Sequence, residues 1–210
     1  MSTTLEAPPD EPVSVWPLVL RYRPGLNLAD RDGFFAFCQD NAPWQIERSP
    51  KGEIIVKMPT GGESGNRNFE LTTQLGIWTR ADGTGRGFDS NTGFDLPNGA
   101  MRSPDAAWVK KARLEVFTAE QKRKFLPLTP DFVVELRSET DSRKALQEKM
   151  EEYVHNGARL ALLLDPLSRR AWVYRPGTAA VEYQDPLLLD CSPELPGFVL
   201  DARAIFDANL

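Results

Sequence analysis

The stretch from residue 130 to residue 165 restricts the possible folds more than any other part of this sequence. It begins with "PDFVVELRS", which is typical of a buried strand, and continues with "DSRKALQEKMEEYVHNG", in which apolar residues recur at helical spacing. It ends with "ARLALLLDP", an apolar run of strand length. Because a helical crossover joins parallel strands, this order predicts a parallel strand–helix–strand unit. We therefore expect an α/β protein with a mixed central β-sheet flanked by helices.

The remaining segments supply further strands and helices. Two strands surround the turn "SPKG", and a second hairpin is expected around "PNGA". The glycine-rich "TGGESGNRN" is expected to be a loop before a helix, in which Leu71, Leu75 and Trp78 lie at helical spacing. Shorter helices are predicted at "DRDGFFAFCQD" and "TAEQKRKF", and a strand at "RRAWVYRPG". We expect one domain over residues 16–210, and a disordered tail over residues 1–15, which are rich in proline, serine, threonine and acid.

Composition argues against several classes of protein. The formal net charge of −5 disfavours a protein that coats nucleic acid non-specifically, although it is compatible with a local basic groove. Cys38 and Cys191 form neither a zinc motif nor a redox pair, so two reduced thiols in a cytoplasmic protein are expected. The sequence shows no signal-peptide pattern and no apolar run of about 18 residues, so no membrane span is expected.

Acidic residues occupy two of the predicted strands. Asp131 and Glu135 share a strand face because side chains alternate across a strand, and Asp105 opens the strand "DAAWV". An unpaired carboxylate in a core strand is costly, so protonation, a basic side chain or a metal ion must compensate it. Two structural explanations remain open: Asp131 as a turn former, and Glu135 as the partner of a nearby arginine. Oxygens from Asp105 and Glu135 together would suit Mg²⁺, which can polarise a phosphoryl oxygen and activate water.

Two side chains on predicted helices are candidates to complete such a site. Lys149 lies on an apolar helical stripe, four residues from both Ala145 and Tyr153, and so faces the sheet. Either its stem follows the edge of the core, or its ammonium points at the acids and orients water or stabilises a phosphorane-like transition state. Glu70 lies in the first turns of the helix after the glycine-rich loop, where it could equally complement the helix dipole.

The single histidine, His155, makes a histidine-based hydrolase an unfavourable interpretation. It lies at the predicted end of a helix, beside Asn156 and Gly157, where an imidazole complements the helix dipole. The sequence contains no G-x-S-x-G elbow, no P-loop, no G-x-G-x-x-G after a strand and no H-E-x-x-H motif. Chemistry is therefore expected from carboxylates and lysine.

The order of several motifs resembles the Uma-two family of restriction-endonuclease-like proteins, in the PD-(D/E)XK nuclease superfamily. The matching stretches are "GEIIVKMPTGGESGNRN", "TGFDLPNGAMRSPDAAWV", "PDFVVELRSETDSRKALQEKMEEYVHNGARLALLLDP", "VYRPG" and "LPGFVLD". The resemblance implies a restriction-endonuclease-like core and Mg²⁺-dependent DNA cleavage, with Asp105 and Glu135 as the metal-binding acids. It also implies that Lys149 replaces the lysine usually found at the position of Arg137. Glu70 matches an acid on the early helix that often completes such sites.

Two classes of function therefore compete. The first is a DNA endonuclease that uses Mg²⁺, or Mn²⁺ as a substitute; an RNA or other phosphodiester hydrolase would use the same metal site. The second is a catalytically silent nuclease-fold scaffold, which the acidic net charge and the acids in "SETDS" favour slightly. For the nuclease a homodimer is expected, because cutting both strands of a duplex needs two active sites.

Overall fold

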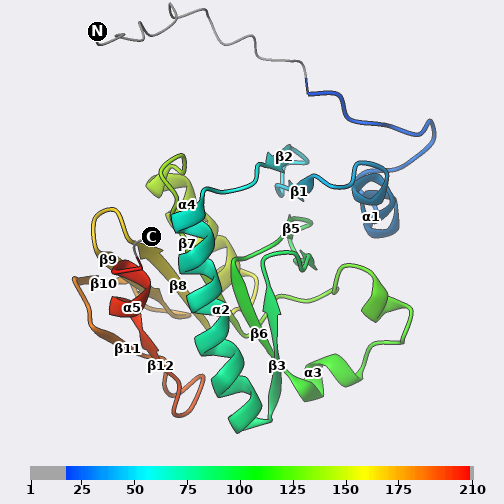
Figure 1. Ribbon diagram of the computed structural model, residues 1–210. Coiled ribbons are helices and arrows are strands. Elements are labelled where there is room, and N and C mark those ends of the chain that lie inside the picture. The colour runs from blue at the N-terminus through cyan, green and yellow to red at the C-terminus, as the bar shows by residue number, and fades with distance from the viewer. Residues whose placement is uncertain (1–17, 209–210) are drawn as a thin grey trace, which may run out of the picture.

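A six-stranded mixed sheet with helices on both faces forms the centre of the structure (Figure 1). This computed structural model describes residues 18–208, so the tail predicted for residues 1–15 lies outside the described residues. The strand order is β10–β9–β8–β7–β6–β3, and all neighbours are antiparallel except β7 and β8. The strands are β3 (Gly85–Asp89), β6 (Ala106–Lys110), β7 (Phe132–Leu136), β8 (Leu160–Asp165), β9 (Arg170–Tyr174) and β10 (Val181–Gln184). The predicted α/β fold with a mixed central sheet is confirmed.

The parallel pair β7–β8 is connected by helix α4 (Arg143–His155). The helix begins where the hydroxyl of Ser142 accepts a hydrogen bond from the backbone N–H of Ala145. It ends before Gly157, whose φ of 107° lies in the region that favours glycine. The strand–helix–strand unit predicted for this part of the chain is therefore present, and it brings α4 onto one face of the sheet.

Successive side chains of β7 point to opposite faces of the sheet and pack in two different hydrophobic clusters. The even-numbered residues of β7 pack in the hydrophobic cluster that includes residues of α2 (Gly62–Asp82) and α5 (Ala202–Phe206). Val133 packs in the other cluster, with Tyr153 of α4. Because side chains at odd positions share a face, Glu135 points to the same side as Val133, which is the side of α4.

The structure also contains a second, four-stranded sheet. Its order is β2–β1–β5–β4, with β1 (Gln45–Arg48), β2 (Ile54–Lys57), β4 (Phe94–Asp95) and β5 (Met101–Arg102). Helix α1 (Arg31–Asp40) packs Phe34 and Phe37 against Ile46 and Met101 of this sheet. The chain leaves β5 and reaches β6 after only three residues, so the small sheet lies next to the start of β6.

Other elements complete the fold. Strands β11 (Leu188–Asp190) and β12 (Val199–Asp201) form a two-stranded sheet, and α3 (Lys111–Glu115) and the 3₁₀ helix η1 (Gln121–Arg123) lie between β6 and β7 in the sequence. The charged helix expected at "TAEQKRKF" is thus only the short η1. Within the described part of the chain, every helix is too short or too polar to cross a membrane.

Helix α2 includes most of the segment expected to be a glycine-rich loop. It begins at Gly62, with Gly61 in an extended conformation before it. Glu63 in the first turn complements the helix dipole, and it pairs with Arg67, one turn later, at 3.2 Å. These local interactions offset the low helix propensity of the glycines, which concealed the start of the helix in the sequence.

Candidate active site

The register of β6 and β7 places two acids side by side. Ala106 pairs with Val134, so Asp105, one residue before β6, lies next to Glu135 on the adjacent strand. The Oδ2 atom of Asp105 accepts a hydrogen bond of 2.7 Å from the backbone N–H of Leu136. This bond fixes the Asp105 carboxylate against the end of β7.

Glu135 is almost fully buried and receives two donors from α4. Its Oε1 atom lies 2.7 Å from Nζ of Lys149 and accepts a hydrogen bond of 3.1 Å from the hydroxyl of Tyr153. Burial, followed by the negative charge of Glu135, raises the pKa of Tyr153 well above its ordinary value, so the hydroxyl remains a donor. The side chain of Lys149 is only 10% exposed. Of the two orientations open to Lys149 in the sequence, the structure shows the ammonium directed at the acids.

Glu47 on β1 is another buried acid, and it contacts the basic side chains of the site. Its Oε1 atom lies 3.0 Å from Nζ of Lys149 and 2.8 Å from Nζ of Lys57. Its Oε2 atom lies 3.2 Å from Nη1 of Arg102. Lys149 therefore bridges Glu47 of the small sheet and Glu135 of the central sheet, which holds its ammonium between two carboxylates.

Lys57 brings a second ammonium to the same group of acids. Its Nζ donates a hydrogen bond of 2.9 Å to the carbonyl oxygen of Ser103, two residues before Asp105. Burial disfavours the charged form of Lys57, but the negative charges of Glu135, Glu47 and Asp105 outweigh it and raise the pKa of this lysine. Lys57 is therefore charged at neutral pH and acts on all three carboxylates.

The acids are compensated unequally. Burial opposes the ionisation of Glu47, but the positive charges of Lys149 and Lys57 outweigh it and lower the pKa of Glu47. Asp105 differs, because burial and then the negative charge of Glu135 raise its pKa to about 7. The side chains around Asp105 thus compensate its charge less than those around Glu47 do.

The donor chemistry of Asp105 and Glu135 fits a hard divalent cation. Over residues 18–208, no group of three or more histidine, cysteine or acidic side chains is arranged to hold a metal ion. Two carboxylates are nevertheless sufficient for Mg²⁺, which keeps several water molecules and can take substrate phosphate oxygens as further ligands. A cation would also relieve the repulsion from Glu135 that raises the pKa of Asp105. Glu47 does not fit as a ligand, because three basic side chains already engage it.

Glu70, the fourth predicted site residue, lies apart from this cluster in the contacts of the described residues. It is half-buried on α2, and its Oε1 accepts a hydrogen bond of 3.0 Å from the side chain of Gln74. The side-chain amide of Gln74 also bonds both the backbone N–H and the backbone carbonyl of Asp201. Glu70 thus belongs to the flank of α2 that meets β12.

Two other charged residues of the β7 region have structural partners. Asp131 accepts a hydrogen bond of 2.9 Å from the backbone N–H of Lys110 and lies 3.0 Å from Nη1 of Arg113. Arg137, where the resemblance leads one to expect a lysine, lies 2.9 Å from the buried carboxylate of Asp165 on β8. The ammonium in direct contact with Glu135 is therefore that of Lys149 on α4.

The sequence interpretation omits Glu47 and Lys57 as site residues. In the β1–β2 hairpin, Gln45 pairs with Lys57 and Glu47 pairs with Ile55, so Glu47 and Lys57 share one face. An acid and a lysine on one side of a predicted hairpin is the signal that could have identified them. Nothing in the local pattern shows that this face meets α4, because the contact depends on how the two sheets pack.

Comparison with known proteins agrees with this fold. The family model "Uma2: Putative restriction endonuclease" matches residues 31–203. A search of curated proteins gives no match. Among solved structures, the crystal structure of "a putative nuclease belonging to DUF820" from Anabaena variabilis ATCC 29413 is similar with a TM-score of 0.66. The two chains are 17% identical, and the likeness covers 77% of this chain and 89% of the other, which establishes a shared fold.

The family match includes every element that builds the acid cluster. It extends from α1 to α5 and contains Asp105, Glu135 and Lys149. The matched residues, 31–203, make up most of the chain. The chain belongs to the Uma2 family.

Proposed function

We propose that this protein is a metal-dependent endonuclease that hydrolyses DNA phosphodiester bonds. The observation that carries this function is the ammonium of Lys149, 2.7 Å from Glu135, which in turn lies beside Asp105. The membership of the Uma2 family supports a nuclease. For cleavage of both DNA strands we propose a homodimer, which light scattering on the purified protein would test.

Asp105 and Glu135 would hold Mg²⁺, or Mn²⁺ as a substitute. When bound, the ion would polarise a phosphoryl oxygen and lower the pKa of a water molecule. The hydrogen bond from Leu136 N–H holds Asp105, and the hydroxyl of Tyr153 holds Glu135. The two carboxylates are thereby preorganised, so little reorganisation is needed to place them around a cation.

Lys149 would supply positive charge where negative charge develops on the phosphate. Its ammonium has three N–H donors, and two of them are directed at Glu135 and Glu47. Among residues 18–208 the ammonium has no other hydrogen-bond partner, so its third donor would orient an attacking water molecule or bind a phosphate oxygen. Glu47 acts through Lys149 and is therefore a positioning residue rather than a catalytic one.

Glu70 is assigned no role as a metal ligand. Its carboxylate is engaged by Gln74, on the flank of α2 that meets β12. We expect Glu70→Gln to leave metal binding and cleavage unchanged. This variant is therefore a useful control, because it removes one acidic charge from the same domain.

Nicking of supercoiled plasmid DNA in the presence of Mg²⁺ or Mn²⁺ tests the proposed activity. The wild type should nick the plasmid, Glu135→Gln and Lys149→Met should lose the activity, and Glu70→Gln should retain it. Equal cleavage by all four proteins would indicate a contaminating nuclease and contradict the proposal. A parallel RNA substrate distinguishes a DNA-specific enzyme from a broader phosphodiesterase.

A second candidate function is a nuclease-fold scaffold without catalysis. It is favoured by one observation: Lys57, Lys149 and Arg102 surround Glu47, and Lys149 also pairs with Glu135, so cations of the chain itself compensate two of the acids. Calorimetry with Mn²⁺ distinguishes the candidates. Absence of binding at millimolar Mn²⁺ favours the scaffold, whereas binding that Asp105→Asn abolishes favours the nuclease.

A further inference from the structure

Asp95 is a buried carboxylate outside the acid cluster, and one of its oxygens has no hydrogen-bond partner within residues 18–208. Asp95, the last residue of β4, is only 4% exposed, and its Oδ1 atom is buried without a hydrogen-bond partner in the part of the chain that the structure describes. Buried carboxylates in proteins are normally hydrogen-bonded or paired with a cation. Consistent with this lack, burial raises the pKa of Asp95 to about 6.

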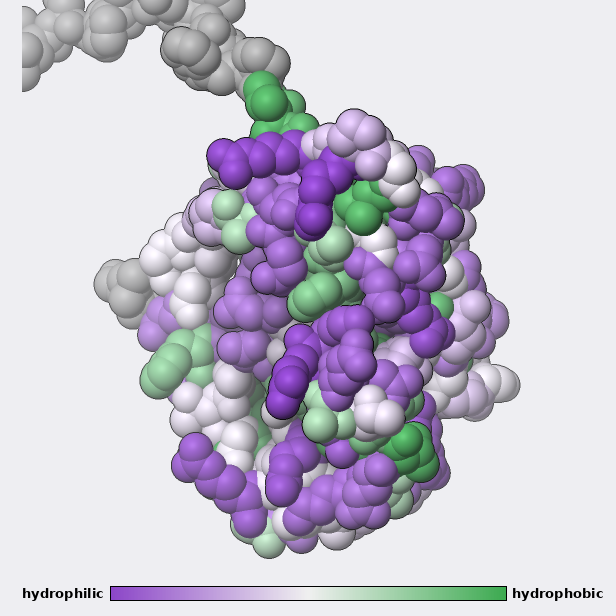
Figure 2. Space-filling view, turned by 90° about the vertical axis from the view of Figure 1, so that its right-hand side faces the viewer, coloured by the Kyte–Doolittle hydropathy of each residue, from purple (hydrophilic) through white to green (hydrophobic). Residues whose placement is uncertain are grey.

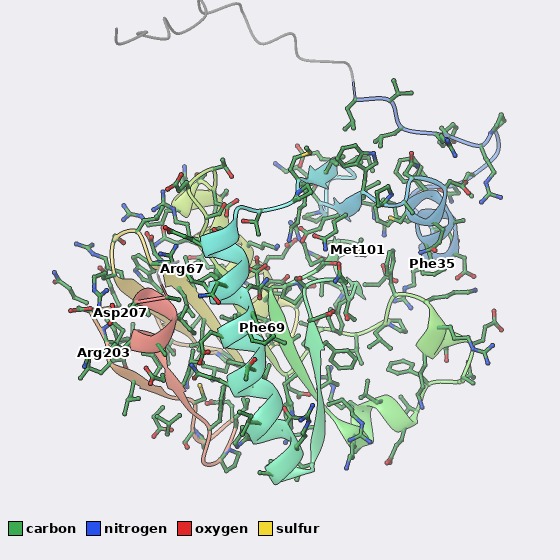
Figure 3. The ribbon with its side chains drawn as sticks, in the orientation of Figure 1. Phe35, Arg67, Phe69, Met101, Arg203 and Asp207 are labelled. Atoms are coloured by element: carbon green, nitrogen blue, oxygen red, sulfur yellow. The ribbon has the colours of Figure 1, made fainter. Side chains whose placement is uncertain are left out.

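Asp95 lines a surface cavity of about 450 Å³, between α1, β4 and the segment around η1. Phe35 and Phe125 form an aromatic wall, with their rings edge-to-face and their centroids 5.0 Å apart. In Figure 3, Phe35 lies below α1, on the side that faces η1. Figure 2 shows this side of the molecule, where small hydrophobic patches lie among hydrophilic residues. The cavity thus combines a buried carboxylate with an apolar wall.

The basic residues near Asp95 are engaged elsewhere or do not reach it. Lys124 lines the cavity but lies 3.1 Å from the carboxylate of Asp32. Arg48 donates its hydrogen bonds to backbone carbonyl oxygens. Arg31 lines the cavity as an exposed side chain, and among the described residues no ion pair joins it to Asp95. Four acidic residues and two basic ones line the cavity, so its charge favours a cation.

We propose that this cavity binds an organic cation, with a guanidinium or amidinium group paired to Asp95 and its apolar stem against Phe35 and Phe125. A planar group with parallel N–H donors matches the geometry of a carboxylate. Aromatic side chains attract such cations and pack on their stems. A metal ion is a poorer match, because no group of three or more metal-binding side chains is found over residues 18–208. The inference does not depend on the proposed nuclease activity.

Isothermal titration calorimetry at pH 8, where Asp95 is ionised, tests the site with two probes. Benzamidine represents a free small molecule, and the capped tripeptide acetyl-Gly-Arg-Gly-amide represents an arginine side chain of a protein. We expect saturable binding of at least one probe, at least tenfold weaker in Asp95→Asn. The matched charge variant Glu148→Gln, on the exposed face of α4, should bind like the wild type. The tighter probe indicates whether the natural ligand is a small molecule or a protein side chain.

Three results would overturn the proposal. The first is no saturable binding of either probe to the wild type at millimolar concentration. The second is equal binding of a probe to the wild type and to Asp95→Asn, when thermal melting curves show that both proteins are folded. The third is binding that occurs only in Arg31→Ala, because it would show that Arg31 of the chain itself fills the site in solution.

Discussion

Lys149 joins three parts of the protein through one ammonium group. It is carried by α4 and contacts Glu135 of β7 and Glu47 of β1. The contact with Glu135 follows from the sequence, because helical spacing turns Lys149 toward the sheet and strand alternation turns Glu135 toward the helix. The contact with Glu47 does not, because it depends on a tertiary contact between residues 102 positions apart.

Replacing Lys149 with methionine keeps the stem and removes the charge. We expect the nicking rate to fall by about 100-fold or more, because the variant lacks the positive charge that stabilises the negative charge developing on the phosphate. Stability should also fall by about 3 kcal/mol, because two buried carboxylates lose a partner. Lys144→Met is the matched control, since the Lys144 side chain on the same helix is 86% exposed. Similar nicking rates for the two variants would exclude Lys149 from catalysis.

The raised pKa of Asp105 predicts a dependence of stability on pH. Its ordinary pKa of 3.8 is raised to about 7 by burial and by Glu135. Between these two values the folded protein holds a proton on Asp105 that the unfolded chain has released, so the contribution of Asp105 to stability decreases as the pH rises. Asp105→Asn removes this contribution, and the wild type should lose more stability than the variant between pH 5 and pH 7.5 in urea denaturation. An identical change in both proteins would contradict the assignment.

Lys57 should compete with a metal ion for the acids. Its charge acts on Glu135, Glu47 and Asp105, so it opposes a second cation in the same place. We expect Lys57→Met to bind Mn²⁺ about tenfold more tightly than the wild type, because a nearby positive charge is removed. Calorimetry measures this affinity, with Lys51→Met, an exposed lysine in the β1–β2 turn, as the control. Unchanged or weaker binding in Lys57→Met would show that Lys57 does not oppose the metal.

At the scale of elements, β7 and α4 follow from local sequence and α2 follows only in part. The Ser142 cap and the glycine after the helix mark both ends of α4. The sequence pattern predicts a later start for α2 than the structure has, because Gly62 and Gly65 favour a loop. The ion pair of Glu63 with Arg67, which supports the first turn, forms only when the segment is helical. Short elements such as β4 and β5, of two residues each, carry no periodicity from which to predict them.

The start of α4 can be tested by removing its cap. The Ser142 hydroxyl accepts a hydrogen bond from the backbone N–H of Ala145, a donor that otherwise has no partner in the helix. Ser142→Ala should lower the free energy of unfolding by about 1 kcal/mol. Denaturation in urea measures the change, and Ser142→Asp should restore stability, because aspartate also caps a helix. A variant as stable as the wild type would show that the cap contributes nothing.

At the scale of the whole molecule, the site is assembled from two sheets and a helix. Glu135 lies near the end of the central strand β7, and Asp105 directly precedes the neighbouring strand β6. Lys149 belongs to the helix that covers this part of the sheet, and Glu47 and Lys57 belong to the small sheet. The central sheet and the helix can be predicted from the sequence, because their hydrophobic patterns extend over many residues. That Glu47 and Lys57 of the small sheet join the site cannot be predicted from the sequence, because no local pattern shows how one sheet packs against another.

The most direct test of the proposed nuclease is a crystal structure of the protein with bound Mn²⁺, in which anomalous scattering locates the ion. The proposal predicts a single peak between Asp105 and Glu135, about 2.1 Å from an oxygen of each, with water molecules as the other ligands. The peak should be absent in crystals of Asp105→Asn grown in the same conditions. No peak at this position at millimolar Mn²⁺, in crystals whose Lys149 still contacts Glu135, would contradict the proposed metal site.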